Sequence, residues 1–317
     1  MSVDYLRISV TDKCNLRCVY CNPLGSCGYV EHREILSFEE IHRIARLSVR
    51  CGIQSVRLTG GEPLVRRNIV HLVQKITATP GINEVTLTTN GVLLEPMAAE
   101  LKAAGLSRIN VSVDSAEREC YQRITGFDLL EKVTRGIYRA IEVGLTPLKI
   151  NAVILKGINE SQVPALARIS LYLPVAVRFI EYCPTSRHTR PSHDFIANSQ
   201  VRKIIESRFG PLSAILGMGA NGPALYFKVR NSAGTIGFIS GRTSVFCRSC
   251  NRLRLTSDGK LRPCLYSAHQ YDLKKLIRSG AGDKQIMALL ERIIEEKHRY
   301  TKFNSFTEDF SMQKIGG

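Results

Sequence analysis

Hydrophobic and polar residues alternate along six short segments in the first 180 residues, and helical patterns separate these segments. The period of two predicts β-strands at residues 5–10, 55–59, 84–89, 108–113, 147–154 and 175–180. Apolar residues at helical spacing predict helices near 37–51, 66–78, 95–104, 128–143 and 160–172. Regular alternation of strands and helices is typical of βα units around a parallel sheet.

Local signals mark the ends of several of these helices. Ser37 precedes the first helix, and Glu40 follows three residues later, which is the pattern of a capping box. Gly52, Gly105 and Gly144 stand where helices should end in a conformation that favours glycine. These signals support the helix boundaries independently of the hydrophobic pattern.

Each predicted strand has one apolar face and one polar face, because side chains alternate along a strand. In the first strand, Leu6 and Ile8 alternate with Arg7 and Ser9. A closed eight-stranded barrel fills its interior with branched apolar side chains, and unpaired buried charges are costly. We therefore expect an α/β fold, an incomplete (β/α)6 TIM-type barrel whose polar lumen holds water or a charged ligand. The polar faces carry Arg7, Ser9, Arg57, Thr59, Thr88, Asn90, Asn110, Ser112, Asp114, Lys149, Asn151 and Arg178.

The pattern changes near residue 183. We predict a partial barrel at 1–183 and a C-terminal α+β extension at 184–317. The segment 184–193 is rich in Ser, His, Arg and Pro and is predicted to be a loop. In the extension we predict two hairpins, at 225–239 and 252–262, and helices at 198–209, 271–278 and 283–298.

Composition and charge narrow the class of protein. The chain has 317 residues and can bury a large core. It has no membrane-length apolar stretch and no signal-peptide pattern, so we expect a cytoplasmic protein without a membrane partner. The formal net charge of +16 predicts a polyanionic ligand, either nucleic acid or a nucleotide triphosphate. The chain has no Trp, and no aromatic residues are interleaved with its basic ones, which disfavours a nucleic-acid stacking platform.

A first group of three cysteines, Cys14, Cys18 and Cys21, follows the first strand as C-x3-C-x2-C. A [4Fe–4S] cluster held by protein alone takes four thiolates, so three leave one iron open for a small molecule. Zinc is the alternative. We call these residues the first triad.

A second group, Cys247, Cys250 and Cys264, has the spacing C-x2-C-x13-C, and we call it the second triad. It is either another open-iron cluster or a zinc site with His269 as fourth ligand. Arg252 and Arg254 follow on one strand face, and guanidinium groups match phosphate oxygens well. A solvated basic strand is the ordinary explanation, but other cations are predicted in the same lumen. Together they suit a triphosphate.

The segment Thr59-Gly-Gly-Glu-Pro63 ends the second strand. Paired glycines allow a ligand to approach the backbone closely, and Glu62 can accept a hydrogen bond from an amine. By itself such a segment usually marks a turn. Asn90 and Ser112, at other strand ends, are candidate partners for the same ligand.

The first triad, with Tyr20 before its last cysteine, resembles the signature of the radical S-adenosylmethionine (SAM) enzymes. Over nearly the whole chain, the resemblance is to members of that family that cyclise GTP in the first step of molybdenum cofactor biosynthesis. The matching segments are Leu6–Cys21, Arg57–Arg67, Leu87–Gly91, Arg108–Asp114, Arg178–Tyr182, Cys247–Leu265 and Ile315–Gly317.

This resemblance implies two [4Fe–4S] clusters, one on each triad, the second binding the guanine base at its open iron. It implies a lyase reaction that gives 3′,8-cyclo-7,8-dihydro-GTP for a downstream cyclic pyranopterin monophosphate synthase, and a homodimer. The SAM site would comprise Tyr20, Gly60, Gly61, Glu62, Asn90, Ser112 and Cys183. GTP would contact Arg7, Arg57, Thr88, Lys149, Arg252, Leu253 and Arg254. The catalytic group would be Arg178, Arg252, Arg254, Gly316 and Gly317.

Three positions depart from the pattern of these enzymes. Ser55 stands where Lys is frequent, Cys183 replaces a frequent Met, and Cys27 lies in a short loop after the first triad. Two alternatives remain. One is a radical SAM enzyme that modifies peptides, and the other, from a different class, is a zinc-stabilised nucleic-acid-binding protein.

Overall fold

The computed structural model describes residues 3–21, 29–183, 194–215, 217, 222–244, 247–267, 269–300 and 312–316. The predicted loop at 184–193, Cys27 and Gly317 lie outside these ranges. The boundary proposed at 183/184 falls at the edge of one such gap and stays a prediction. Among the described residues, no helix combines the length and apolar character needed to cross a membrane.

The six predicted strands form a parallel sheet in chain order. They are β1 (Tyr5–Ser9), β2 (Ser55–Thr59), β3 (Glu84–Thr89), β4 (Arg108–Ser112), β5 (Lys149–Ile154) and β6 (Ala176–Glu181). Their apolar faces are fully buried, as at Leu6, Ile8, Val56 and Leu58. The predicted alternation of an apolar and a polar face is therefore confirmed.

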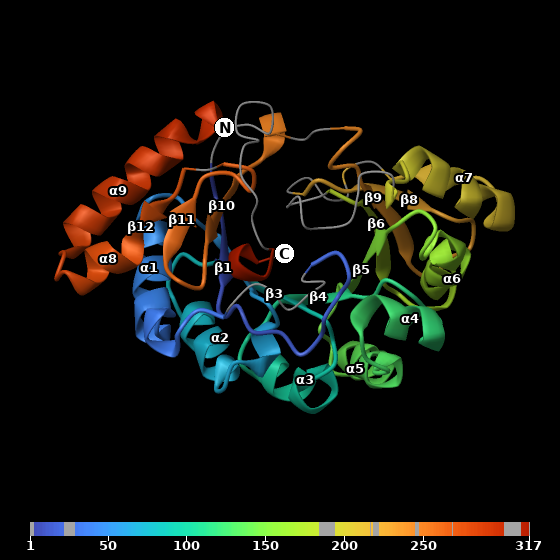
Figure 1. Ribbon diagram of the computed structural model, residues 1–317, viewed down its shortest axis with the longest axis horizontal. Coiled ribbons are helices and arrows are strands. Elements are labelled where there is room, and N and C mark those ends of the chain that lie inside the picture. The colour runs from blue at the N-terminus through green and yellow to red at the C-terminus, as the bar shows by residue number, and fades with distance from the viewer. Residues whose placement is uncertain are drawn as a thin grey trace.

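Helices cover the outer face of the curved sheet (Figure 1). They are α1 (Phe38–Arg50), α2 (Ile69–Thr77), α3 (Leu94–Ala103), α4 (Arg118–Thr125), α5 (Leu130–Glu142) and α6 (Val163–Tyr172). The predicted capping box is present, because Ser37 Oγ accepts from Glu40 N at 3.1 Å and Glu40 Oε2 accepts from Ser37 N at 2.7 Å. Sequence reasoning missed α4, whose short, mostly polar sequence buries few apolar side chains. Short 3-10 turns lie at His32–Glu34 (η1), Pro63–Val65 (η2) and Glu160–Gln162 (η3).

The C-terminal region extends the same sheet at both edges, which the sequence analysis did not anticipate. Strand β10 (Arg252–Leu255) pairs in parallel with β1, and β9 (Thr235–Ile239) pairs in parallel with β6. Both predicted hairpins are confirmed: β8 (Leu225–Lys228) with β9, and β10 with β11 (Lys260–Arg262). The strand order is β12-β11-β10-β1-β2-β3-β4-β5-β6-β9-β8-β7, so the barrel is open in the part of the chain that is described.

The remaining C-terminal elements are the two outermost strands of this sheet and several helices. They are α7 (Asn198–Phe209), β7 (Ser213–Ala214), η5 (Cys247–Ser249), β12 (Tyr271–Asp272), α8 (Leu273–Arg278), α9 (Asp283–Glu296), η6 (Lys297–Arg299) and α11 (Met312–Ile315). The helix predicted at 198–209 is confirmed residue for residue. The short helix α11, near the C-terminus, lies inside the curve of the sheet rather than on its outer face (Figure 1).

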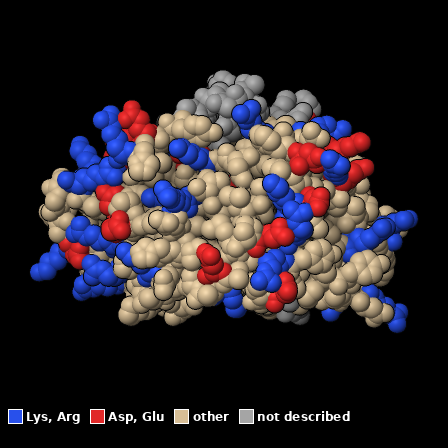
Figure 2. All heavy atoms as spheres, turned by 90° about the horizontal axis from the view of Figure 1, so that it is seen from below, with Lys and Arg blue, Asp and Glu red and all other residues tan. Residues whose placement is uncertain are grey.

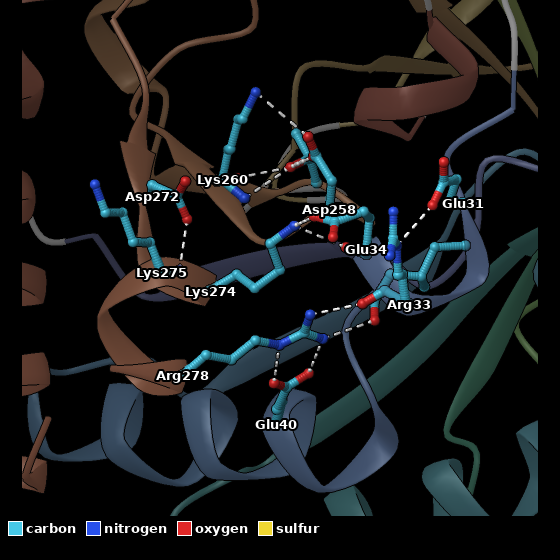
Figure 3. A network of polar contacts seen from close by, with 12 residues as sticks. Glu31, Arg33, Glu34, Glu40, Asp258, Lys260, Asp272, Lys274, Lys275 and Arg278 are labelled. Atoms are coloured by element: carbon cyan, nitrogen blue, oxygen red, sulfur yellow. Dashed lines mark hydrogen bonds and ion pairs between the residues drawn. The ribbon is translucent and has the colours of Figure 1, made fainter. Parts of the chain in front are cut away.

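A polar network ties α8 to the segment between the first triad and α1 (Figure 3). Arg278 contacts both carboxylate oxygens of Glu40, at 2.7 and 3.1 Å, and donates to the carbonyl oxygens of Arg33 and Ile35 at 2.6 and 3.1 Å. Lys274 Nζ pairs with Glu34 Oε2 at 2.5 Å. These contacts fix the C-terminal extension against the N-terminal barrel.

Candidate active site in the lumen of the open barrel

The first triad lies just beyond β1, at the carboxyl end of the parallel strands. Burial raises the pKa of Cys18 strongly, and Asp114, Cys21 and Cys14 raise it further, which shows that the thiols share one pocket. Asn90 Nδ2 lies 3.8 Å from Cys14 Sγ, and Leu16 N donates to the same sulfur at 3.4 Å. Three thiols with hydrogen-bond donors around them are a donor set that fits an iron–sulfur cluster.

Gly60 and Gly61 pack against the segment that leads to the first triad. A Cβ atom on Gly60 would lie 2.6 Å from Thr11 O, and one on Gly61 would collide with Lys13 O. Gly61 N donates to Thr11 O at 2.7 Å. The glycines thus allow two segments of the chain to pack closely together. The sequence analysis instead expected them to let a ligand approach the backbone.

Glu62 is buried and holds the turn that follows β3. Its carboxylate accepts from Thr89 Oγ1 at 2.6 Å, Asn90 N at 2.7 Å and Leu64 N at 3.0 Å. Burial raises the pKa of Glu62 to about 7, although these three hydrogen bonds oppose the shift. An ionised carboxylate can accept about four hydrogen bonds, so one direction remains for a ligand amine.

Other predicted SAM-site residues lie at or just beyond the carboxyl ends of their strands. Ser112 is the last residue of β4, and Tyr20 donates to the buried Asp114 two residues further on. Cys183 follows β6, and its sulfur lies 3.3 Å from where a Cβ on Gly241 would be. Sequence reasoning placed Asp114 on the lumen face but missed it as the partner of Tyr20.

The second triad gathers at the opposite, amino end of the strands. Cys247 and Cys250 precede β10, while Cys264 follows its antiparallel partner β11, so both approach the start of β10. Burial raises the pKa of Cys264, and the nearby Cys250 and Cys247 raise it too. The pKa of Cys250 is lowered: burial opposes the shift, but Arg252, Lys297 and Arg254 outweigh it.

Lys297 is a buried cation beside the second triad that sequence reasoning missed. It is 7% exposed, and its Nζ donates to Pro263 O at 2.7 Å. A cation beside a thiol favours the thiolate, which is the form that binds metal. In the sequence, the only signal for this role was the position of Lys297 at the basic end of the helix predicted at 283–298.

A pocket opens at the amino ends of the strands. Six of its lining residues are the first residues of their strands: Tyr5, Ser55, Glu84, Arg108, Lys149 and Arg252. The cations Arg7, Arg57 and Arg178 also line it. Barrel sites ordinarily lie at the carboxyl ends of the strands. Here the first triad lies at that end, whereas the cation-lined pocket opens at the amino ends of the same strands.

Neighbouring side chains hold several of these cations in place. Arg57 Nε donates to Thr86 Oγ1 at 3.0 Å, and Arg178 Nε donates to Asn151 Oδ1 at 2.8 Å. The amide oxygen of Asn110, in the orientation that satisfies both neighbours, accepts from Arg57 and, at 3.2 Å, from Arg178. Their donors are therefore aimed before any ligand arrives.

The cations repel one another, and among the described residues more cations than carboxylates line the pocket. Burial, followed by Arg254 and Arg57, lowers the pKa of Arg7. Burial and then Arg252 lower the pKa of Arg254 to about 10. Burial and then Arg178 lower the pKa of Lys149 to about 7. Such a site favours a polyanion, which would relieve the repulsion.

Two residues predicted to contact GTP differ in their placement. The hydroxyl of Thr88 is buried without a hydrogen-bond partner among the described residues, and its β4 neighbour Asn110 is on the lumen face. Leu253 is 1% exposed and belongs to the hydrophobic core. Its side chain faces away from the lumen, so only its main chain is available to a ligand.

The C-terminal segment enters the lumen near the carboxyl ends of β1 and β2. Arg254 Nη1 donates to Gly316 O at 2.8 Å. Gly316 has a φ of +83°, and a Cβ there would collide with Thr59 Oγ1. Ser9 and Thr59 are cross-strand partners, so the tail packs onto the polar faces of two adjacent strands.

Among the described residues, no group of three His, Cys, Asp or Glu side chains is placed to hold one metal ion. His269, the candidate fourth zinc ligand, packs its ring edge-on against Tyr300, with centroids 5.6 Å apart. In a cluster each cysteine binds a different iron, so three sulfurs need not converge on one point.

Comparison with known proteins adds a family to this geometry. Residues 8–169 match the Radical SAM superfamily, and residues 175–303 match Molybdenum Cofactor Synthesis C. A protein named GTP 3′,8-cyclase from Pelotomaculum thermopropionicum is 42% identical over 317 residues, covering 99% of this chain and 98% of its own. One of the same name from Thermodesulfovibrio yellowstonii is 43% identical over 297 residues, covering 93% and 92%.

Solved structures share the fold at low sequence identity. Streptococcus suis SuiB bound to S-adenosylmethionine gives a TM-score of 0.63 at 14% identity, over 97% of this chain and 76% of that one. Native anSMEcpe with bound AdoMet and Cp18Cys peptide gives 0.55 at 15% identity, over 94% and 84%. At these identities the likeness is one of fold alone.

Proposed function

Because this chain belongs to the radical SAM superfamily and to the GTP 3′,8-cyclases within it, we propose that it converts GTP to 3′,8-cyclo-7,8-dihydro-GTP. This is the first step of molybdenum cofactor biosynthesis. One observation carries the proposal: two three-cysteine groups stand at opposite ends of one lumen, and cations line the lumen between them.

Cys14, Cys18 and Cys21 would hold the radical-generating [4Fe–4S] cluster and leave one iron for SAM. When bound, the cluster and SAM would supply a 5′-deoxyadenosyl radical able to take the hydrogen from ribose C3′. Addition of C3′ to guanine C8 would leave a base radical, and one electron and one proton would complete the dihydro product. Glu62 has one acceptor direction left for the SAM amine. Asn90, which donates toward Cys14, supports a SAM site at the same strand ends.

Tyr20, Gly60, Gly61, Ser112 and Cys183 complete the proposed SAM site. Tyr20 is tied to Asp114, which keeps its ring beside the triad. The two glycines bring β2 against the triad segment, and a ligand at the open iron would meet this turn. Their role is therefore to hold the SAM-binding surface together.

Cys247, Cys250 and Cys264 would hold the second [4Fe–4S] cluster, with guanine at its open iron. The lowered pKa of Cys250 supports a thiolate ligand there. Arg252 lines the pocket on the same side, so base and phosphates would bind close together. The phosphate donors would be Arg7, Arg57, Lys149, Arg252 and Arg254, with Thr88 and the Leu253 main chain at their side.

Arg178, Arg252, Arg254, Gly316 and Gly317 form the proposed catalytic group. Arg254 joins this group directly to the tail through Gly316 O. The contact supports a role for the tail inside the lumen rather than outside it. A fixed tail would also restrict water around the reacting ribose, which protects a reactive radical.

The reaction class, the compartment, the assembly and the next enzyme are also part of the proposal. We propose a lyase in the cytoplasm, where a reducing environment preserves thiols. We propose a homodimer, since two-fold dimers are the commonest soluble assembly. Its product would pass to a downstream cyclic pyranopterin monophosphate synthase.

The nucleic-acid alternative finds no support on the face seen in Figure 2. There Lys and Arg are interspersed with Asp and Glu and do not form one continuous basic patch. The peptide-modifying alternative has little support, because the likeness of this chain to SuiB and to peptide-bound anSMEcpe is one of fold alone. Neither alternative accounts for the cation-lined pocket.

The decisive experiment uses anaerobically reconstituted protein with GTP, SAM and dithionite. We expect about eight irons per chain, and 5′-deoxyadenosine together with the cyclic nucleotide. Cys264→Ala should still cleave SAM but form no cyclic product, whereas Cys51→Ala, at the end of α1, should behave like the unaltered chain. Zinc without iron, or product from Cys264→Ala, would refute the proposal.

A further inference from the structure

Arg108 is a cation of the lumen that the sequence analysis did not assign to any ligand. It is the first residue of β4, and it lines the same pocket as Arg57, Lys149, Arg178 and Arg252. Strand side chains alternate, so Arg108 lies on the same face as Asn110 and Ser112. Its charge therefore belongs to the pocket and not to the outer surface.

Arg108 is paired with a carboxylate of the neighbouring strand. Its Nη2 lies 2.5 Å from Glu84 Oε2, with the two side chains 24% and 27% exposed. Arg108 is the register partner of Thr86, and Glu84 lies two residues earlier on the same face of β3. The pair therefore spans the amino mouth of the lumen diagonally.

The guanidinium of Arg108 is only partly used by this contact. Its Nε is buried and has no hydrogen-bond partner among the described residues. A guanidinium can donate from Nε and one terminal nitrogen together, in a bidentate contact with two oxygens of one phosphate. In Arg108 only the terminal nitrogen is used, by Glu84, so this bidentate edge is half occupied.

Glu84 supplies counter-charge to the empty pocket. Six cations and two carboxylates line the pocket, and one of the carboxylates, Asp4, is hydrogen-bonded to Asn251. Glu84 opposes the burial and cation repulsion that lower the pKa values of Lys149 and Arg57. An ion pair partly open to water contributes little net stability, so a polyanion can replace it.

We infer that Arg108 is a further substrate-binding residue that contacts the triphosphate of GTP, and that Glu84 is its counter-ion when the pocket is empty. On binding, a phosphate takes the Nε/Nη2 edge, and Glu84 is released toward the open mouth. The inference rests on the proposed function, since it identifies a further residue that binds the phosphates of that substrate. Arg108 would also supply a positive charge to a mouth of the pocket where Ser55, the register partner of Glu84 on β2, offers none.

A purely structural ion pair between β3 and β4 is the competing explanation. The two explanations differ in the sign of one effect. Removal of either partner would harm a structural pair equally. If Glu84 instead competes with phosphate, loss of Arg108 weakens GTP binding and loss of Glu84 strengthens it.

The test measures dissociation constants for GTP and for guanosine, by anaerobic equilibrium dialysis of the protein with both clusters reconstituted. Arg108→Gln should weaken GTP binding about tenfold to hundredfold, the range for a lost hydrogen bond to a charged group. Guanosine binding should stay within about twofold, because guanosine has no phosphate. Glu84→Gln should strengthen GTP binding several-fold, and Arg108→Lys should fall between Arg108→Gln and the unaltered chain.

Arg139→Gln is the matched control, because Arg139 pairs with Glu142 on the outer helix α5 at 2.8 Å. It should leave both constants unchanged. If the unaltered protein binds guanosine and GTP equally or not at all, the proposed function is what fails. If it prefers GTP but Arg108→Gln and Glu84→Gln shift GTP affinity in the same direction, or Arg108→Gln weakens guanosine equally, the inference on Arg108 is overturned.

Discussion

The hydroxyl of Tyr20 donates a 2.5 Å hydrogen bond to Oδ2 of Asp114, across 94 positions of sequence. The other oxygen of Asp114 accepts from Val153 N at 2.8 Å, so one buried carboxylate connects the first triad to β4 and β5. Burial raises the pKa of Asp114 to about 6, and the two hydrogen bonds oppose this shift. The aromatic residue of the cysteine motif thus has a structural partner in addition to any contact with SAM.

We predict that Tyr20→Phe destabilises the reconstituted protein by about 1–3 kcal/mol, the cost of leaving a buried acceptor without its donor. The measurement is the shift in thermal midpoint under anaerobic conditions, together with SAM affinity. Tyr172→Phe is the control, because Tyr172 is 75% exposed and should tolerate loss of its hydroxyl. Equal midpoints for the two variants would show that the Asp114 contact contributes nothing.

Gly316→Ala should displace the tail from Arg254, since a Cβ there would collide with Thr59 Oγ1. We expect cyclic product to fall at least about tenfold, the loss that follows small displacements of an active-site group, while SAM cleavage continues. Gly280→Ala separates strain from collision, because Gly280 has a φ of +85° and nothing within 4 Å of a Cβ. Thr59→Ala in the Gly316→Ala background should restore part of the product. A double variant as inactive as Gly316→Ala would argue against a steric cause.

GTP affinity should fall as the pH rises above about 7, because Lys149 has a pKa of about 7 in the empty pocket. A bound triphosphate favours the ammonium form, so binding takes up a proton wherever the free lysine is neutral. The terminal phosphate, with a second pKa near 6, is already ionised there. Lys149→Arg keeps its charge and should give a flatter profile between about pH 7 and pH 9. Identical slopes for both proteins would contradict this assignment.

The lowered pKa of Lys149 also makes the free energy of unfolding depend on pH. An unfolded lysine keeps the ordinary pKa of 10.5, so between about 7 and 10.5 the unfolded chain binds more protons than the folded one. The Lys149 contribution to the free energy of unfolding therefore rises with pH across this interval. Lys149→Met should remove that rise, as urea unfolding of the GTP-free protein at two pH values would detect.

Arg278→Ala should destabilise the protein by about 1 kcal/mol, because it removes a two-pronged contact with Glu40 that is partly open to solvent. It also deprives the carbonyl groups of Arg33 and Ile35 of a donor. Arg139→Ala breaks the exposed pair with Glu142 and should cost almost nothing. Urea midpoints measure both, and equal shifts would mean that the network in Figure 3 has no special role.

Periodicity and local signals were sufficient for the elements whose causes lie within a few residues. The two-faced strands, the Ser37 capping box and α7 depend on alternation, capping and helical spacing, which are local properties. The short helix α4 was missed because its polar sequence gives little periodic signal. The cysteine spacing predicted two metal-binding triads, with zinc as the alternative to iron, and the assignment of these cysteines as cluster ligands stays a prediction.

Only the tertiary structure decided which end of the lumen each group occupies. Alternation tells which face of a strand a residue is on, but not how far along the barrel axis its charge lies. The parallel pairing of β10 with β1 brings Arg254 beside Arg7 and the second triad to the amino end of the sheet. Three further features depend on residues that are far apart in the chain or on different strands. They are the Tyr20–Asp114 hydrogen bond, the Arg108–Glu84 ion pair and the burial of Lys297. Their distances arise from sheet register and helix packing, which no local pattern encodes.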